Sequence, residues 1–303
     1  MPSTIQRKAH LRYRDHSPAT DYSDKPLGLG VKTFVFENVD GHMREHALAI
    51  QLGGKTTFEQ TRNVFLLEAL GKGVTVVPGE VFFTEEERDR YRLLREDADG
   101  LFDVMTENPA VENIRDAFVA NATFESFRHE LILRTIKGGL EAGDVEAIYG
   151  TAHSTLSEQV AKQGVYVVHE IEPQILNWDS LLMQRLMKGE NPASISDIDY
   201  KRAMLAYACG ENPVFEAIAD KPFNEVTTED TRFVIAALNG LIEALDESGL
   251  DEVIRSRRVA PLFSLNGIPD PSKHKLTRTA LESFLDRNAG ERPDSMAGRF
   301  WKN

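Results

Sequence analysis

Histidine is the side chain best suited to proton transfer or metal binding near neutral pH. Five of the eight histidines fall between residues 31 and 175: His42, His46, His129, His153 and His169. His42 follows a strand-like segment at 34–39, and His153 follows another at 145–149. Ligands of an open parallel sheet bind beyond the carboxyl ends of its strands, so we expect His42 and His153 to converge on one site. The alternative is that each is a polar cap residue in a strand-to-helix turn.

The segment Gly150-Thr-Ala-His153 favours the functional interpretation. Glycine lets the chain leave a strand sharply, and the free amide groups at the start of the next helix attract an anion. The same segment is also compatible with a simple helix cap formed by Ser154 or Thr155.

The segments around these histidines predict two βαβ units. The first has a strand at 33–39, a helix at 57–70 and a strand at 74–77, and the second has a strand at 145–149, a helix at 155–162 and a strand at 165–171. The hydrophobic rhythm changes from two residues to 3.6 and back, with glycines at several boundaries. We therefore expect the four strands to lie parallel in one sheet.

The rest of the chain is predicted to be helical. A long helical stretch covers 84–140 with a break at Asn108-Pro109, and further helices are expected at 181–187, 203–208, 213–219, 228–245 and 276–285. Residues 1–30 are polar and show no sustained periodicity, which indicates an arm. The expected fold class is α/β, with a mostly parallel sheet flanked by helices and a helical C-terminal half. The expected domains are a polar N-terminal arm at 1–30, an α/β domain at 31–175 and a helical region at 176–303.

The stretch EAIYGTAHSTLSEQVAKQGVYVVHEI, Glu146 to Ile171, resembles the C-terminal signature of the TraB, Tiki and erythromycin-esterase/ChaN-like superfamily. In that signature a strand ends in G-x-x-H, and a short helix and another strand follow. Three other features stand in the expected order: His42 in Glu37-Asn-Val-Asp-Gly-His after an early strand, Glu80 after a second strand, and Arg128 on the preceding helix. The resemblance covers residues 31–172. Relatives have a compact G-x-x-H or G-E-x-H as the first motif, whereas here glycine directly precedes His42.

The resemblance implies one cleft, which different relatives use for metal-dependent peptide cleavage, ester hydrolysis or haem binding. For this chain it implies a hydrolase of a peptide or ester bond, with Glu80, Arg128 and His153 as catalytic groups and Arg128 orienting a substrate anion. His42 and His153 would hold a divalent metal, Zn or Mn, that activates water. Without metal, a histidine with a carboxylate partner activates water directly. The same cleft would alternatively serve a binding or regulatory protein that holds haem or another small ligand.

A competing pattern is His42-Met-Arg-Glu45-His46, which matches the H-x-x-E-H motif of inverzincin metallopeptidases. Two histidines one helical turn apart would ligate zinc, and the glutamate would polarise the attacking water. His46 is a metal ligand in this interpretation, and the third ligand would be Glu125 or Glu130.

Other motifs favour structural roles. Glu125, Arg128 and His129 stand at helical i, i+3 and i+4 spacing, which is typical of a solvated, salt-linked helix face. The single cysteine, Cys209, excludes an internal disulfide framework and has no nearby pattern of a catalytic nucleophile.

The acidic composition restricts the partners. Asp and Glu number 48 against 35 Lys and Arg, which gives a formal net charge of −13 and argues against a nucleic-acid partner. No apolar stretch is long enough to predict a membrane span, and the first residues lack the apolar run of a secretory signal. These features favour a cytoplasmic protein with a small-molecule or peptide substrate.

Overall fold

A computed structural model describes residues 7–14, 30–36, 71–150, 153, 155–162, 166–171, 176–209, 218–219, 228–258, 260–269 and 278–291. The predicted helix at 57–70 and most of the predicted helix at 213–219 lie outside these residues. His42 and His46 lie outside them too.

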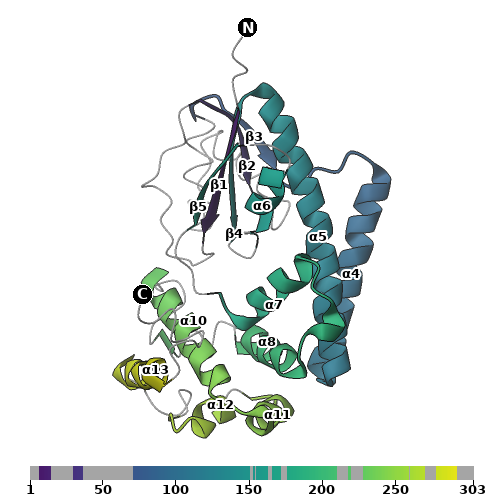
Figure 1. Cartoon of the computed structure of the whole chain (residues 1–303). Coiled ribbons are helices and arrows are strands. Elements are labelled where there is room, and N and C mark those ends of the chain that lie inside the picture. Colours follow the sequence, from purple (N-terminus) through teal and green to yellow (C-terminus); the bar gives the residue numbers. More distant parts are fainter. Residues whose placement is uncertain are drawn as a thin grey trace, which may run out of the picture. The chain divides into compact units, whose positions relative to one another are not determined.

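A parallel sheet of five strands confirms the predicted α/β fold (Figure 1). Its order is β3-β2-β4-β1-β5, and every neighbouring pair is parallel. The strands are β1 (Lys8–Arg14), β2 (Val31–Phe36), β3 (Thr75–Pro78), β4 (Asp144–Gly150) and β5 (Tyr166–Ile171). The four strands predicted at 33–39, 74–77, 145–149 and 165–171 correspond to β2, β3, β4 and β5.

The prediction of a polar arm over residues 1–30 is wrong for β1. This strand lies between β4 and β5, where Ala9 and Leu11 are 0% exposed. Basic residues alternate with these apolar ones, so the segment lacks the continuous apolar run expected of a buried strand. One of them, Arg12, is neutralised by Glu146 of β4 at an N···O distance of 2.7 Å, so a charged side chain is tolerated inside the sheet.

One face of the sheet packs against α5 (Val111–Ala142) and α6 (Thr155–Lys162). Ile132 and Ile136 of α5 and Leu156 of α6 join the apolar side chains of β1, β2 and β4 in a single core. The approach of helix to sheet is closest at Gly139. A Cβ atom added there would lie 2.9 Å from Val145 and 3.0 Å from Thr33, so this position requires a residue without a side chain.

The long helical stretch predicted at 84–140 is two helices, α4 (Glu85–Glu107) and α5, separated by the predicted break at Asn108-Pro109. Glu85, Glu86 and Glu87 occupy the first turn of α4, where the helix dipole stabilises negative charge. Thr84 caps the helix by accepting a hydrogen bond from the Glu87 amide at 3.1 Å.

The described residues divide into two compact units. Unit 1 lies within residues 1–16, 20–92 and 125–174 and contains the sheet, whereas unit 2 lies within 93–124 and 175–303. The expected α/β domain at 31–175 therefore differs from unit 1: β1 belongs to unit 1, and residues 93–124 belong to unit 2. β1 joins unit 1 because it lies within the sheet, and residues 93–124 leave it because α4 and α5 are each divided between the units.

Unit 2 is helical in its described parts, as predicted for the C-terminal half. After the segments of α4 and α5 come α7 (Trp178–Met187), the 3₁₀ turn η2 (Pro192–Ser194), α8 (Asp197–Cys209), α10 (Thr228–Glu243), α11 (Glu247–Ser256), α12 (Ala260–Leu265) and α13 (Arg278–Glu291). α8 packs against α7, α10 and α11, and the core includes the fully buried Tyr200, Leu241 and Phe263.

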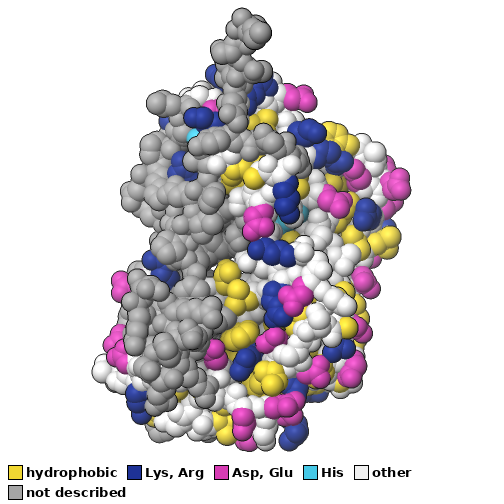
Figure 2. Space-filling model, viewed as in Figure 1, with side chains coloured by type: hydrophobic (Ala, Val, Ile, Leu, Met, Phe, Trp, Pro, Cys, Tyr) yellow, Lys and Arg dark blue, Asp and Glu magenta, His cyan; other side chains and the backbone are white. Residues whose placement is uncertain are grey.

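On the described surface in Figure 2, side chains of both charge signs are intermingled. A stretch with the length and apolarity of a membrane span was not found among the described helices.

Candidate functional site

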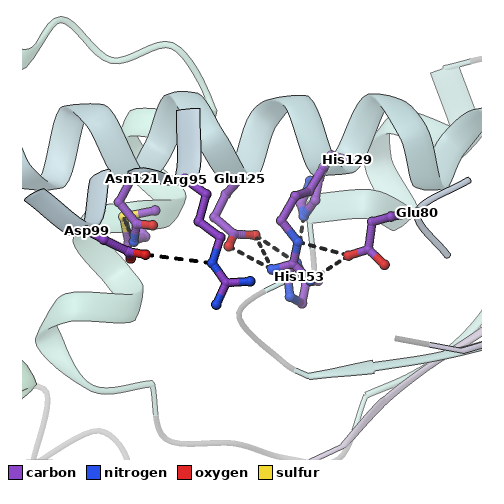
Figure 3. A network of polar contacts seen from close by, with 9 residues as sticks. Glu80, Arg95, Asp99, Asn121, Glu125, His129 and His153 are labelled. Carbon is purple, nitrogen blue, oxygen red and sulfur yellow. Dashed lines mark hydrogen bonds and ion pairs between the residues drawn. The ribbon is translucent and has the colours of Figure 1, made fainter. Parts of the chain in front are cut away.

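The site lies in unit 1, where the carboxyl ends of two strands meet the middle of α5. Glu80 follows β3 and His153 follows β4, so both leave the sheet at the same edge. Glu125 and His129 are one helical turn apart on α5, and Figure 3 shows both side chains pointing toward His153.

Glu125, His129 and His153 form a compact group of possible metal ligands. His129 Nε2 lies 2.8 Å from His153 Nδ1, and Glu125 Oε2 lies 3.8 Å from the same His153 nitrogen. The three ligand atoms are all within 4.8 Å of one another. Both histidines are buried, His129 at 1% and His153 at 6% exposure, and Glu125 is partly buried.

The donor set fits a divalent ion with a small adjustment. Two neutral imidazoles and a carboxylate are common ligands of catalytic zinc, with Zn–N bonds of about 2.0–2.1 Å. Two such nitrogens on a tetrahedral ion lie about 3.3 Å apart. The observed 2.8 Å separation therefore has to widen by about 0.5 Å.

Arg128 links the two carboxylates of the site. Its Nε and Nη2 donate to Glu80 Oε1 at 2.9 and 2.6 Å, and its Nη1 donates to the two Glu125 oxygens at 2.7 and 3.0 Å. The Arg128 and Glu80 side chains are 11% and 4% exposed, so this is a buried ion pair. Arg128 is therefore paired with both carboxylates of the site, and its role in orienting a substrate anion stays a prediction.

Glu80 keeps one oxygen available. Its Oε2 is buried and has no hydrogen-bond partner among the residues that the structure describes. A buried carboxylate oxygen without a partner is costly, and it is a ready acceptor for the proton of a nearby water.

The turn that carries Glu80 is fixed to α5 by a second arginine. Arg134 donates to the Val81 carbonyl oxygen at 3.2 Å and to Glu87 Oε2 at 2.9 Å. The same Glu87 carboxylate accepts a hydrogen bond from the Phe83 amide at 2.9 Å. The hydrogen bond from Arg134 and that from Phe83 lower the pKa of Glu87 to about 2, so this link stays charged over the ordinary pH range.

Three of the predicted site residues, Glu80, Arg128 and His153, belong to this one network of polar contacts. The predicted convergence of His42 with His153 and the H-x-x-E-H motif with His46 concern residues outside the described part of the chain. Of the two proposed third ligands in that motif, Glu125 lies beside His129 and His153, whereas Glu130 is exposed and lines a different hollow.

His129 is the candidate ligand that sequence reasoning missed, and Glu125 was proposed only as a third ligand for His42 and His46. The prediction that they form a solvated helix face is wrong, because His129 is buried and the Glu125 side chain is only 16% exposed. Their E-x-x-x-H spacing was a visible signal, since it places two possible ligands on one face of a helix. Their convergence with His153, 24 residues further along, was not visible.

Comparison with protein-family models, curated proteins and solved structures finds no match for this chain. The candidate site therefore stands on its geometry.

Proposed function

We propose that this protein is a metal-dependent hydrolase of a peptide or ester bond. The observation that carries the proposal is the convergence of Glu125, His129 and His153, whose ligand atoms lie within 4.8 Å of one another at the carboxyl edge of the sheet. Three protein ligands leave a coordination position for water or substrate, as in catalytic zinc sites. Zn or Mn is the expected ion.

The metal would polarise the substrate carbonyl and lower the pKa of a bound water. Within the protein, Glu80 Oε2 is the group proposed to take the proton of the attacking water. Arg128 holds Glu80 through two hydrogen bonds to its other oxygen, which fixes the direction of Oε2. The burial of His129 and His153 keeps competing water away from their ring nitrogens.

Metal content tests the ligand set. After loading with Zn or Mn and dialysis, we expect about one ion per chain in the wild type. Replacing Glu125 with Gln, or His129 or His153 with Ala, should weaken binding at least about 100-fold, since each removes one of three ligands. Glu130→Gln is the matched control, because it changes an exposed carboxyl beside His129 and should retain the ion. Retention in His129→Ala and His153→Ala, with loss in His46→Ala, would favour the inverzincin alternative, whose third ligand would be Glu125 or Glu130.

Activity is tested separately from metal content. With p-nitrophenyl acetate and a fluorogenic peptide library as substrates, Glu80→Gln should lower kcat by about 10²- to 10⁴-fold without changing metal stoichiometry. A metal-loaded protein that hydrolyses neither substrate class would contradict the hydrolase proposal. It would leave the ion site in a binding or regulatory protein.

A second candidate mechanism rests on the 2.8 Å distance between His129 and His153. That distance is a good hydrogen bond, in which one ring donates a proton to the other. With His153 Nδ1 donating to His129 Nε2, the other ring nitrogen of His153, Nε2, would take the proton of the attacking water without metal. Hydrolysis that persists in excess EDTA would favour this mechanism over the metal site.

A further inference from the structure

Unit 2 contains a cavity of about 300 Å³, separate from the residues of the proposed hydrolytic site. It lies between the end of α4, the connection that follows it at Pro109, α8 and the end of α11. Most of its lining side chains are apolar: Pro109, Met204, Leu205, Cys209, Val253 and Ile254. An apolar ligand is favoured there because its binding removes apolar surface from water.

Two consecutive arginines, Arg257 and Arg258, line the same cavity. They follow Ser256, the last residue of α11, and Arg257 caps that helix in the left-handed conformation with a φ of 53°. Arg257 is the only non-glycine residue with a positive φ in the described ranges.

The charge at this cavity is positive. The described lining residues include Arg257 and Arg258 and no Asp or Glu. Arg257 Nη2 donates to the backbone carbonyl oxygen of Glu107, which holds its guanidinium at the cavity without neutralising its charge. Arg258 is exposed, so its guanidinium is accessible to a ligand from solvent. In an acidic chain of net charge −13, a cavity with two arginines and no acidic lining is suited to an anion.

We propose that this cavity binds an amphiphilic anion, with an unbranched apolar chain among Met204, Leu205, Val253 and Ile254 and an oxyacid head group at the arginines. At about 30 Å³ per heavy atom in a liquid, 300 Å³ holds roughly ten heavy atoms. That matches a carboxylate or phosphate monoester of medium chain length. Guanidinium groups bind both head groups through paired hydrogen bonds.

Calorimetric titration of the full-length protein tests the site with octanoate, octyl phosphate and octanol. Excess EDTA is present, so that a carboxylate does not bind to a metal held by Glu125, His129 and His153. We expect saturable binding of octanoate or octyl phosphate with a Kd below about 1 mM. The stronger of the two identifies the head group. Octanol should bind at least about tenfold more weakly, because it carries no charge for the arginines.

Two variants locate the binding. Arg258→Gln should weaken the anions at least about tenfold and leave octanol unchanged, whereas Arg255→Gln, at an exposed position in the last turn of α11, should change neither by more than about twofold. Ala208→Trp, an exposed lining position, should block all three ligands. Three results would each overturn the proposal: equal affinity for octanol and octanoate, anion binding that survives Ala208→Trp, or no measurable binding of any of the three ligands.

Discussion

Replacing Arg128 with Met removes the cation that Glu80 and Glu125 share. The change keeps most of the apolar length of the side chain and deletes its hydrogen bonds to both carboxylates. Because the Glu80 side chain is only 4% exposed, it would be left as a buried charge without its counter-ion. Loss of one partner of a buried ion pair costs about 3–5 kcal/mol of unfolding free energy.

Glu80→Gln is expected to cost less. The amide keeps the shape of the carboxyl group, and Arg128 remains paired with Glu125 at 2.7 Å. Loss of a charge-assisted hydrogen bond then amounts to about 1–3 kcal/mol. In the double variant Arg128→Met/Glu80→Gln, the second change removes the buried negative charge that the first change leaves without a counter-ion. The double variant should therefore be at least about 1 kcal/mol more stable than the sum of the two single changes predicts.

The assay is a double-mutant cycle on metal-free protein, in which urea unfolding is followed by hydrogen exchange in β4 and in residues 125–142 of α5, both of which belong to unit 1. The matched control is the exposed pair Arg88–Glu85, whose side chains are 61% and 80% exposed. Its coupling energy, measured with Arg88→Met and Glu85→Gln, should stay below about 0.5 kcal/mol. A coupling energy between Arg128→Met and Glu80→Gln as small as that of the control pair would contradict the reasoning that the buried ion pair stabilises the site.

Two further predictions concern packing and pH. Gly139→Ala should destabilise the protein by about 1–3 kcal/mol, because its new Cβ would lie 2.9 Å from a side chain of the sheet. Gly138→Ala, whose Cβ has nothing within 4 Å, should stabilise the helix by up to about 1 kcal/mol. Thermal unfolding should show changes of opposite sign in the melting temperatures of the two variants. Burial raises the pKa of Asp179 to about 6, because it disfavours the charged carboxylate. The free energy of unfolding therefore carries no loss from Asp179 below about pH 4, falls as the pH rises to 6, and has lost the full amount above that. Asp179→Asn should raise the unfolding free energy at pH 7 by about 2–3 kcal/mol and flatten its change between pH 4 and 7, and an unaltered pH profile would contradict this.

The hydrophobic rhythm of the sequence was enough to predict β2, β3, β4 and β5, because apolar side chains at fixed periods select strand or helix locally. It was also enough to place Glu80 and His153 after strands whose carboxyl ends share one edge of the sheet. The break between α4 and α5 followed from Asn108-Pro109, since proline restricts the residue before it.

β1 was not predictable by the same means. Its sequence, Lys-Ala-His-Leu-Arg-Tyr-Arg, alternates apolar with basic residues, which is typical of a strand exposed on one face. The interior position of β1 places Arg12 beside Glu146, which lies far along the chain and neutralises it. A partner at that separation is not visible in a local pattern.

The candidate metal site divides in the same way. The sequence by itself determined that Glu125 and His129 share one face of a helix, and that His153 follows a strand. Only the tertiary structure decided that α5 passes the turn after β4 that carries His153, which places His129 2.8 Å from His153. The physical reason is that helix periodicity orients side chains within an element, whereas the packing of α5 on the sheet sets the distance between elements, and that packing depends on the whole core.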